Sequence, residues 1–291
     1  MSDAWDRIRD KERCTVEITL AEQGIFLLPA KVTQDQAKEK AWEQKHNVFG
    51  TLAKFLMRPK SEEIQVSLLE LRYQPFWHAI GHKRFRYDRR THYPVPVLTD
   101  VQTVEIAGQT CTPAQGKLTL QGVDHCLLEE RHEIFLDALT GEAQDFRRYL
   151  AFDRLDAGNS NALPADLALA PPEVRAPVVV RQVLGDVLHP PSADKIFEAE
   201  VVVDCLELYY RPVYAFEYVW QAKDKRATVE VDGLTGEFKP TGKAFGNQLK
   251  GVLNRDMLFD IGAETINLVV PGGAIALKLT KAVAERRGKT F

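Results

Sequence analysis

The chain carries two copies of one sequence pattern. Residues 69–75 read Leu-Glu-Leu-Arg-Tyr-Gln-Pro, and residues 206–212 read Leu-Glu-Leu-Tyr-Tyr-Arg-Pro. Each stretch is followed downstream by Asp-x-Leu-Thr-Gly-Glu, at residues 137–142 and 232–237. Such self-similarity indicates that one supersecondary unit is present twice. We therefore expect function to lie in what one copy has and the other lacks, or in the groove between them.

The spacing of the motifs differs between the copies. Leu206 follows Leu69 by 137 positions, whereas Asp232 follows Asp137 by only 95, so the first copy holds about 42 additional residues. This insertion falls roughly between residues 88 and 130. The second copy is therefore the compact template.

The second copy predicts its own strands. Aromatic residues alternate with smaller ones over 213–220, a turn is expected at 222–225, and a return strand follows at 227–231. In both copies Thr-Gly ends the last strand, where Gly141 and Gly236 can take the positive φ that a tight turn needs.

These patterns predict an α+β protein made of two degenerate tandem antiparallel sheet modules with flanking helices. The first module is expected at residues 1–155 with its insertion at about 89–130, and the second, compact module at 178–245. Clustered Asn, Gly and Pro residues predict a linker at 156–177. A chain of 291 residues is long enough for two such cores.

The N-terminal part of the chain has clear local signals. Alternation over residues 15–20 and an apolar run over 25–28 predict a short β-hairpin with one buried face. Thr33 and Gln36 form a capping-box pattern that should begin a helix running to about His46.

The residues before and within the first repeat predict a helix and two strands. The helix is expected at 48–57, followed by a strand at 65–73. Pro75 is expected to be an edge or bend residue, with a separate aromatic strand beginning at Phe76.

The C-terminal tail, residues 246–291, is strongly apolar around a Pro-Gly-Gly break and is predicted to be mostly helical. As a helix it presents a stripe of Ile275, Leu279 and Val283. That stripe could pack on the protein's own core, on a partner or second subunit, or peripherally on an anionic membrane surface. Alternation of Ile275, Leu277 and Leu279 leaves a strand hairpin open, and internal charges argue against a transmembrane span.

Bulk properties narrow the class of protein. The formal net charge of -3 and pI of about 6.2 give no general attraction to nucleic acid or acidic membranes, so such a partner would need a local patch. The first 13 residues lack an apolar signal region, and a cytoplasmic location is expected. The four cysteines are widely scattered, which predicts free thiols. No cofactor is predicted.

Residues 78–93 form the strongest local signal for binding. Basic residues alternate there with aromatic ones, and an extended chain would place Arg84 and Arg86 on one face and Phe85 and Tyr87 on the other. This combination suits phosphate neutralisation with base stacking, but also a hairpin with solvated arginines or a protein contact. The candidate binding residues are Lys83, Arg84, Phe85, Arg86, Tyr87, Arg89 and Arg90.

Histidines and cysteines give a weaker signal, and no metal site or catalytic residue is predicted from them. His78, His82 and His92 lie in the same hairpin, but nothing in the sequence makes them converge. In the insertion, His125 and Cys126 are adjacent and should point to opposite faces of a strand. A metal-dependent or Cys/His enzyme centred on that pair is therefore the weakest alternative.

The repeat also carries a family resemblance. An aromatic strand, a turn, a second strand and Asp-Gly-Leu-Thr-Gly-Glu at 232–237 resemble the PepSY-type module, a small α+β unit, and residues 137–142 are a looser copy. The match covers some 25 to 35 residues per copy. The resemblance implies an inhibitory or binding module, mostly exported or membrane-linked in that family, with no catalytic residues to transfer.

Together these observations predict a non-enzymatic binding or assembly protein that acts through protein contacts or self-association. Nucleic-acid or polyanion binding through residues 78–93 is the alternative.

Overall fold

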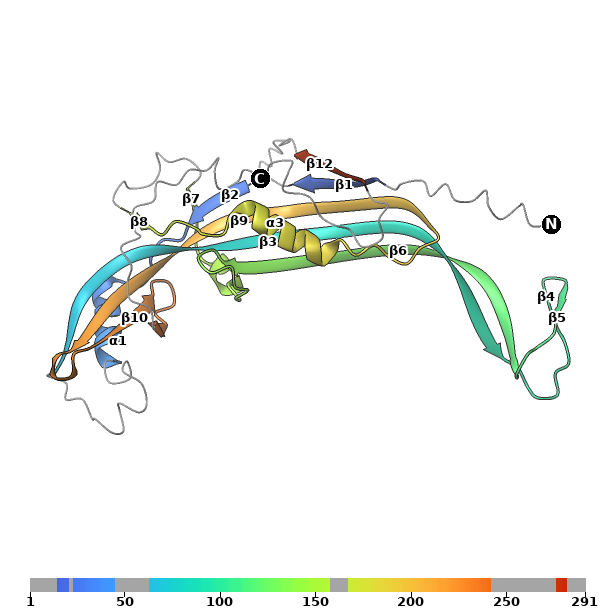
Figure 1. Ribbon diagram of the computed structural model, residues 1–291, viewed down its shortest axis with the longest axis horizontal. Coiled ribbons are helices and arrows are strands. Elements are labelled where there is room, and N and C mark those ends of the chain that lie inside the picture. Colours follow the sequence, from blue (N-terminus) through green and yellow to red (C-terminus); the bar gives the residue numbers. More distant parts are fainter. Residues whose placement is uncertain (1–14, 21–22, 45–62, 158–166, 242–275, 282–291) are drawn as a thin grey trace, which may run out of the picture.

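A single mixed sheet of ten strands dominates the protein. The computed structural model describes residues 15–20, 23–44, 63–157, 167–241 and 276–281. Three long antiparallel strands run side by side along an arch (Figure 1). They are β3 (Ile64–Pro96), β6 (Lys117–Asp137) and β9 (Lys195–Trp220).

Strand β9 is the centre of the sheet. One edge pairs with β3, and the other edge is shared by β10, which is antiparallel, and by β2 and β1, which are parallel. The shorter strands are β1 (Thr15–Leu20), β2 (Gln23–Leu27), β7 (Leu155–Asp156), β8 (Ala168–Leu169), β10 (Lys225–Asp232), β11 (Phe238–Thr241) and β12 (Ala276–Lys281). Strand β11 pairs with β10, β12 with β1 and β7 with β2, whereas β6 and β8 pair with β3.

The prediction of an α+β protein with flanking helices is wrong. The described residues contain only two α-helices, α1 (Gln34–Glu43) and α3 (Ala176–Val187), against the ten-stranded sheet. The two sequence copies pair with each other through β3 and β9, so they share one sheet. A period-two pattern shows which residues share a face but does not identify the neighbouring strand, so the repeat alone does not distinguish one shared sheet from two.

A local pseudo-twofold axis passes between β3 and β9. Gln74 lies opposite Arg211, and these are the same position in the two copies. On either side of this pair, Tyr73 lies opposite Pro212 and Pro75 opposite Tyr210. Antiparallel pairing of equivalent residues relates the copies by rotation about an axis through the Gln74–Arg211 pair.

The two helices cover one face of the sheet in a crossed arrangement. Helix α1 precedes β3 but packs against β9 and β10 of the second copy. Helix α3 precedes β9 but packs mainly against β3 and β6 of the first copy. The predicted capping box of Thr33 and Gln36 is confirmed at the start of α1. The apolar stripe that α3 buries consists of Val179, Val180, Val183, Leu184 and Val187.

The opposite face is covered by a short 3-10 helix, η3 (Arg147–Ala151), and we call it the η3 face. Phe76 stacks between Phe146 and Tyr209 on this face, with ring centroids 4.5 and 5.2 Å away. Tyr149 completes the cluster. This small aromatic core separates the polar groups described below.

Pro75 and Pro212 lie inside long strands without ending them. Pro75 sits where the outer neighbour of β3 changes from β8 to β6, and Pro212 where that of β9 changes from β2 to β10. Their carbonyls accept hydrogen bonds from the N–H groups of Ala138 and Gly233, at 3.1 and 2.8 Å. The N–H and C=O of a strand residue point to the same edge of the strand. The missing N–H of each proline therefore lies at the outer edge, where the neighbouring strand changes, and no ladder hydrogen bond is lost there. The separate strands predicted around Pro75 are therefore one strand.

Both ends of the chain depart from their predicted pairing. Strands β1 and β2 exist, but each pairs with β9, so the predicted hairpin between them is wrong. The described part of the tail, β12, is a strand parallel to β1 with Leu279 opposite Ile18, so the helical stripe is wrong at that residue. Ile275, Val283 and the helix predicted at 48–57 lie outside the described residues.

Candidate functional site

The two Asp-x-Leu-Thr-Gly-Glu segments form equivalent turns. In the first, the Asp137 carboxylate accepts from the backbone N–H groups two and three residues on, at 2.8 and 3.0 Å. Asp232 does the same in the second, at 2.9 Å to both. Gly141 and Gly236 have φ of 77° and 69°, as predicted. These turns are structural elements common to both copies.

A buried polar cluster lies at the pseudo-twofold axis. Arg211 is 8% exposed and donates to Asp232 at 2.9 Å and to Gln74 at 2.6 Å. The Tyr149 hydroxyl also donates to Asp232, at 2.5 Å, and the Gln74 amide donates to Glu230 at 2.8 Å. Burial raises the pKa of Asp232, but the hydrogen bonds from Tyr149 and the turn, together with the Arg211 charge, outweigh it and lower that pKa. The cluster binds the two copies together.

A second polar cluster on the η3 face surrounds His78, which is 5% exposed. Its Nε2 lies 2.9 Å from the Glu133 carboxylate on β6. Its Nδ1 lies 3.5 Å from Cys205 Sγ and 3.6 Å from Glu207 Oε2, both on β9. The donor atoms of His78, Cys205 and Glu207 all lie within 4.8 Å of one another, so these residues could hold a metal ion.

Glu207 is held in place from its other side. Tyr209 donates a hydrogen bond to it at 2.7 Å, and Arg154 lies 3.4 Å away with its guanidinium over the Phe26 ring. Burial raises the pKa of Glu207, but its contacts with His78 and Tyr209 and the Arg154 charge bring it down to about 2. Burial, followed by the Glu207 charge, raises the pKa of the Cys205 thiol. The resting cluster thus holds a carboxylate and a protonated thiol.

This cluster could not be predicted from the sequence, because its members come from different strands. His78 and Cys205 are 127 positions apart and are brought together only by the β3–β9 register. A signal was present in the repeat. In the alignment of the two copies, His78 stands against Ala215 and Cys205 against Leu68, so these two donors occur in one copy only.

The two sets of residues considered in the sequence, His78 with His82 and His92, and His125 with Cys126, do not converge as sets. His82 contacts Asp204 at 2.6 Å, away from His78. On β6, His125 is 81% exposed in its side chain and contacts Asp88, whereas Cys126 lies opposite Tyr87 on the other face. The expectation that His125 and Cys126 point apart is confirmed.

The basic-aromatic stretch forms part of β3, with its side chains alternating as predicted. Lys83, Phe85 and Tyr87 are buried on the helix side of the sheet, and Arg84 and Arg86 are exposed on the η3 face. The basic groups have carboxylate neighbours. These pairs are Lys83 with Glu130, Arg84 with Glu129 and Glu198, Arg86 with Glu198, and Arg89 with Asp124. The positive charge of the stretch is therefore largely balanced within the sheet.

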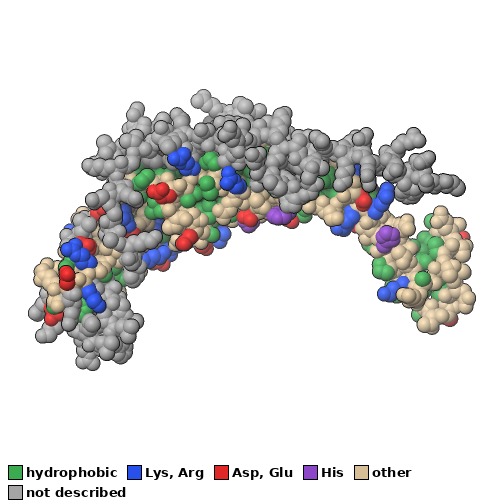
Figure 2. Space-filling model, in the orientation of Figure 1, with side chains coloured by type: hydrophobic (Ala, Val, Ile, Leu, Met, Phe, Trp, Pro, Cys, Tyr) green, Lys and Arg blue, Asp and Glu red, His purple; other side chains and the backbone are tan. Residues whose placement is uncertain are grey.

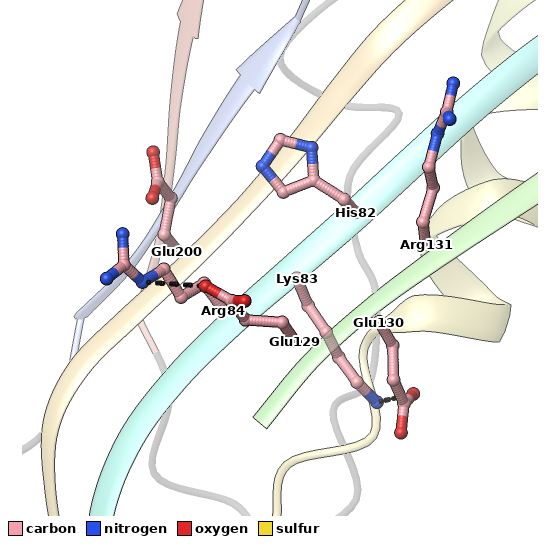
Figure 3. Close-up of a pocket in the computed structure, with 7 residues that line it drawn as sticks. All are labelled: His82, Lys83, Arg84, Glu129, Glu130, Arg131 and Glu200. Atoms are coloured by element: carbon pink, nitrogen blue, oxygen red, sulfur yellow. Dashed lines mark ion pairs between the residues drawn. The ribbon is translucent and has the colours of Figure 1, made fainter. Parts of the chain in front are cut away.

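An open pocket of about 360 Å³ lies in this region (Figure 3). Its lining contains three basic side chains, three carboxylates and His82. Figure 3 shows Arg84 directed at Glu129 and Lys83 directed at Glu130. The lining pairs its own charges, and it does not favour a ligand of either sign. The lining residues are His82, Lys83, Arg84, Glu129, Glu130, Arg131 and Glu200.

Beyond Asp88 the strand β3 leaves β9 and continues with β6 alone. We call this two-stranded projection, residues 89–124, the arm; it ends in the hairpin of β4 (Val104–Ile106) and β5 (Gln109–Cys111) (Figure 1). The arm occupies most of the insertion deduced from the repeat. The additional residues thus lengthen two existing strands and add a tip.

Asp124 fixes the shape of the arm at its base. Its carboxylate accepts hydrogen bonds from Tyr93, Thr91 and Arg89 on the facing strand, at 2.7 Å for Thr91 and 3.0 Å for Arg89. These hydrogen bonds lower the pKa of Asp124 to about 2, so the carboxylate is ionised at neutral pH. The two strands are therefore joined by side chains as well as by the ladder.

The arm exposes apolar side chains, and Figure 2 shows hydrophobic groups on the surface of its free end. The largest exposed fraction is 76%, at Leu98. At its base, Arg86 and Lys195 lie over the exposed Phe197 ring, 5.6 and 5.0 Å from its centroid. The exposed apolar residues of the arm and its base are Tyr93, Val95, Leu98, Ile106, Val123, Leu127 and Phe197.

No protein-family model, curated protein or solved structure matches this chain. Within the described part of the chain, neither helix is long and apolar enough to cross a membrane. The function is argued below from the geometry.

Proposed function

We propose that the protein is a non-enzymatic assembly component whose arm binds a protein partner. The observation that carries this proposal is the set of exposed apolar side chains, on both faces of a projection without a core of its own. The predicted resemblance to PepSY-type modules is compatible with a binding role and stays a prediction.

The stability of a two-stranded ribbon supports the proposal. An isolated ribbon is marginal in water because it has only one ladder and little apolar burial. The arm is nevertheless long, and it is stiffened at its base by Asp124. Contact with a partner would bury Leu98, Val123 and Leu127, which the protein itself leaves exposed.

The base of the arm has the composition of a protein interface. Phe197 is flanked by Arg86 and Lys195, and Leu127 lies opposite Arg86 on the same face. Aromatic residues and arginine are enriched where proteins meet, and they contribute most of the binding energy there. We therefore place the centre of the contact at the base and its extension along the arm.

Site-specific photo-crosslinking tests this proposal. A photoreactive amino acid at Leu127 or Leu98 in the native cells should give one discrete adduct, identified by mass spectrometry. The matched control is Leu155, which is also exposed, at 52%, but lies on β7 away from the arm. Light scattering of the purified chain shows whether the partner is a second copy.

Two outcomes would contradict the proposal. One is crosslinking at Leu127 and Leu98 no stronger than at Leu155. The other is a discrete adduct from Leu98 that survives the double substitution of Leu127→Asp and Phe197→Asp, because two carboxylates would destroy an apolar contact there.

Polyanion binding makes a different prediction. Arg84 and Arg86 would have to exchange their carboxylate partners for phosphates, so retention on heparin or single-stranded DNA should fall with salt. Arg84→Ala with Arg86→Ala should abolish that retention if this alternative holds. Because Glu129 and Glu198 already neutralise both groups, we expect weak retention that the double substitution does not change.

A further inference from the structure

The His78 cluster is confined to one of the two copies. Position by position, His78 corresponds to Ala215 and Cys205 to Leu68, and only Glu207 has a counterpart of its own kind, Glu70. The shared scaffold elements are present in both copies. Residues that the shared scaffold needs should occur in both copies. His78 and Cys205 occur in one copy only, which indicates a role added to the scaffold.

A β-bulge beside the cluster sets the direction of Cys205. The β3–β9 register skips Asp204, and it skips the equivalent position, Ser67, near the other end of the pairing. A bulge bends its strand and redirects the neighbouring side chains. Here Cys205 and Glu207, two residues apart, lie on the same face of β9, and both contact the Nδ1 atom of His78.

The two donor separations measured from His78 Nδ1 are close to those around a tetrahedral zinc ion. Bond lengths of about 2.0 Å to nitrogen or oxygen and 2.3 Å to sulfur require ligand atoms about 3.5 Å apart for N and S, and about 3.3 Å apart for N and O. The observed distances from His78 Nδ1 are 3.5 Å to Cys205 Sγ and 3.6 Å to Glu207 Oε2. The third separation, from Cys205 Sγ to Glu207, lies within 4.8 Å, where a tetrahedral ion requires about 3.5 Å.

The surroundings supply the outer partners that a metal-bound histidine uses. The Glu133 carboxylate, paired with Arg147 at 3.3 Å, accepts from Nε2 of His78 and so leaves Nδ1 with its lone pair facing the other two donors. Glu207 is oriented by Tyr209. Carboxylate–histidine pairs of this kind fix the ring and raise its basicity toward a metal.

We propose that His78 Nδ1, Cys205 Sγ and Glu207 bind one Zn²⁺ ion, with water at the fourth position. A thiolate and a carboxylate offset the double charge of the ion, and the nitrogen, sulfur and oxygen donors suit zinc better than magnesium or calcium. Binding displaces the thiol proton of Cys205 to solvent. The site joins β3 to β9 in the middle of the arch.

The same residues do not form a thiol nucleophile. A Cys205–His78–Glu133 series has the connectivity of a catalytic triad, but a cysteine nucleophile acts as the thiolate. Burial, followed by the Glu207 charge, raises the pKa of the Cys205 thiol and so disfavours a free thiolate. Acyl transfer is therefore disfavoured relative to metal binding.

Cobalt and zinc titrations of the full chain test this proposal. After removal of metals with a chelator, Co²⁺ should give the sulfur-to-cobalt charge-transfer band of a thiolate ligand, and one equivalent of Zn²⁺ should remove it. Cys205→Ser should abolish the band and weaken zinc binding by more than about 100-fold, while Glu133→Gln, an outer partner, should weaken it by about 10- to 100-fold. Cys126→Ser, at a half-buried cysteine on β6, is the matched control and should leave both readings unchanged.

Circular dichroism confirms that each variant is folded, and His78→Gln replaces Cys205→Ser as the ligand variant, with the same expected loss of zinc binding, if the latter is not. Absence of the band in the folded natural chain, or its persistence in Cys205→Ser, would overturn the proposal. Either result would leave the role proposed for the arm unaffected.

Discussion

Asp232 and Asp137 occupy equivalent turns but have different hydrogen-bond partners. Both carboxylates accept the same two backbone N–H groups. Only Asp232 also accepts from buried Arg211 and from Tyr149, whereas the position equivalent to Arg211 in the first copy is Gln74, which carries no charge. The turn itself could be predicted from the sequence, since it is local; the ion pair could not, since it depends on which strands meet.

Substitution of the two aspartates should therefore have unequal effects. Asp232→Asn removes the charge partner of buried Arg211 and should lower the free energy of unfolding by about 3 kcal/mol. Asp137→Asn keeps an amide oxygen that can accept the turn hydrogen bonds and loses only their charge assistance, so it should cost no more than about 1 kcal/mol. Urea denaturation at neutral pH measures both values, and equal losses would contradict this account of the axis cluster.

The Asp232 effect should also depend on pH. The lowered pKa means that Asp232 stabilises the folded state fully above its unfolded pKa near 3.8, and that this contribution is lost as the pH falls through the lower folded value. The difference between the natural chain and Asp232→Asn should thus be constant from pH 7 to about 5 and shrink below about 4. Denaturation over that range tests the sign; a difference that grows in acid would refute it.

At the scale of elements, the local signals were reliable and the pairing signals were not. The capping box, the glycine turns, the return strand after residue 225 and the place of the insertion were all encoded within short windows. The partners of β1, β2 and β12 were not, because alternation defines a buried face without naming a neighbour. The candidate basic stretch was located correctly as an alternating strand, but its carboxylate partners come from β6 and β9.

The tip of the arm, residues 97–116, should be dispensable for folding. The strands of the arm extend beyond the last β9 pair and the tip pairs only with itself, so replacing residues 97–116 by Asn-Gly between Pro96 and Lys117 should give a tight hairpin. We expect the unfolding temperature to change by less than about 3 °C, equivalent to under about 1 kcal/mol. Calorimetry measures this, and a large fall would show that the tip contributes to the core.

At the scale of the whole molecule, the crossed helices make the two copies interdependent. Helix α1 covers the second copy's strands and α3 covers those of the first, while β3 and β9 share the central ladder. Neither copy can bury its apolar face without the other. The sequence repeat indicates two units. It does not indicate that each unit's helix packs on the other unit, because that depends on contacts between residues far apart in the sequence.

Unfolding should accordingly be a single event. We expect one calorimetric transition whose measured enthalpy equals the van't Hoff enthalpy, as in a cooperative two-state system. A fragment of residues 1–157 alone should lack the near-ultraviolet signal of packed aromatics, and adding residues 158–291 should restore it. Two separated transitions, or an independently folded fragment, would contradict this expectation.

The Gln74–Arg211 pair has a consequence for how such a chain could arise from a symmetric dimer. In a dimer of identical subunits, a residue on the twofold axis faces its own copy, and two buried arginines would repel each other. Once both halves lie in one polypeptide, the two positions can mutate separately, and an acceptor can face a donor. Covalent fusion thus permits a complementary pair at a position where symmetry would force a like pair, which gives a single chain an advantage that two separate subunits cannot have.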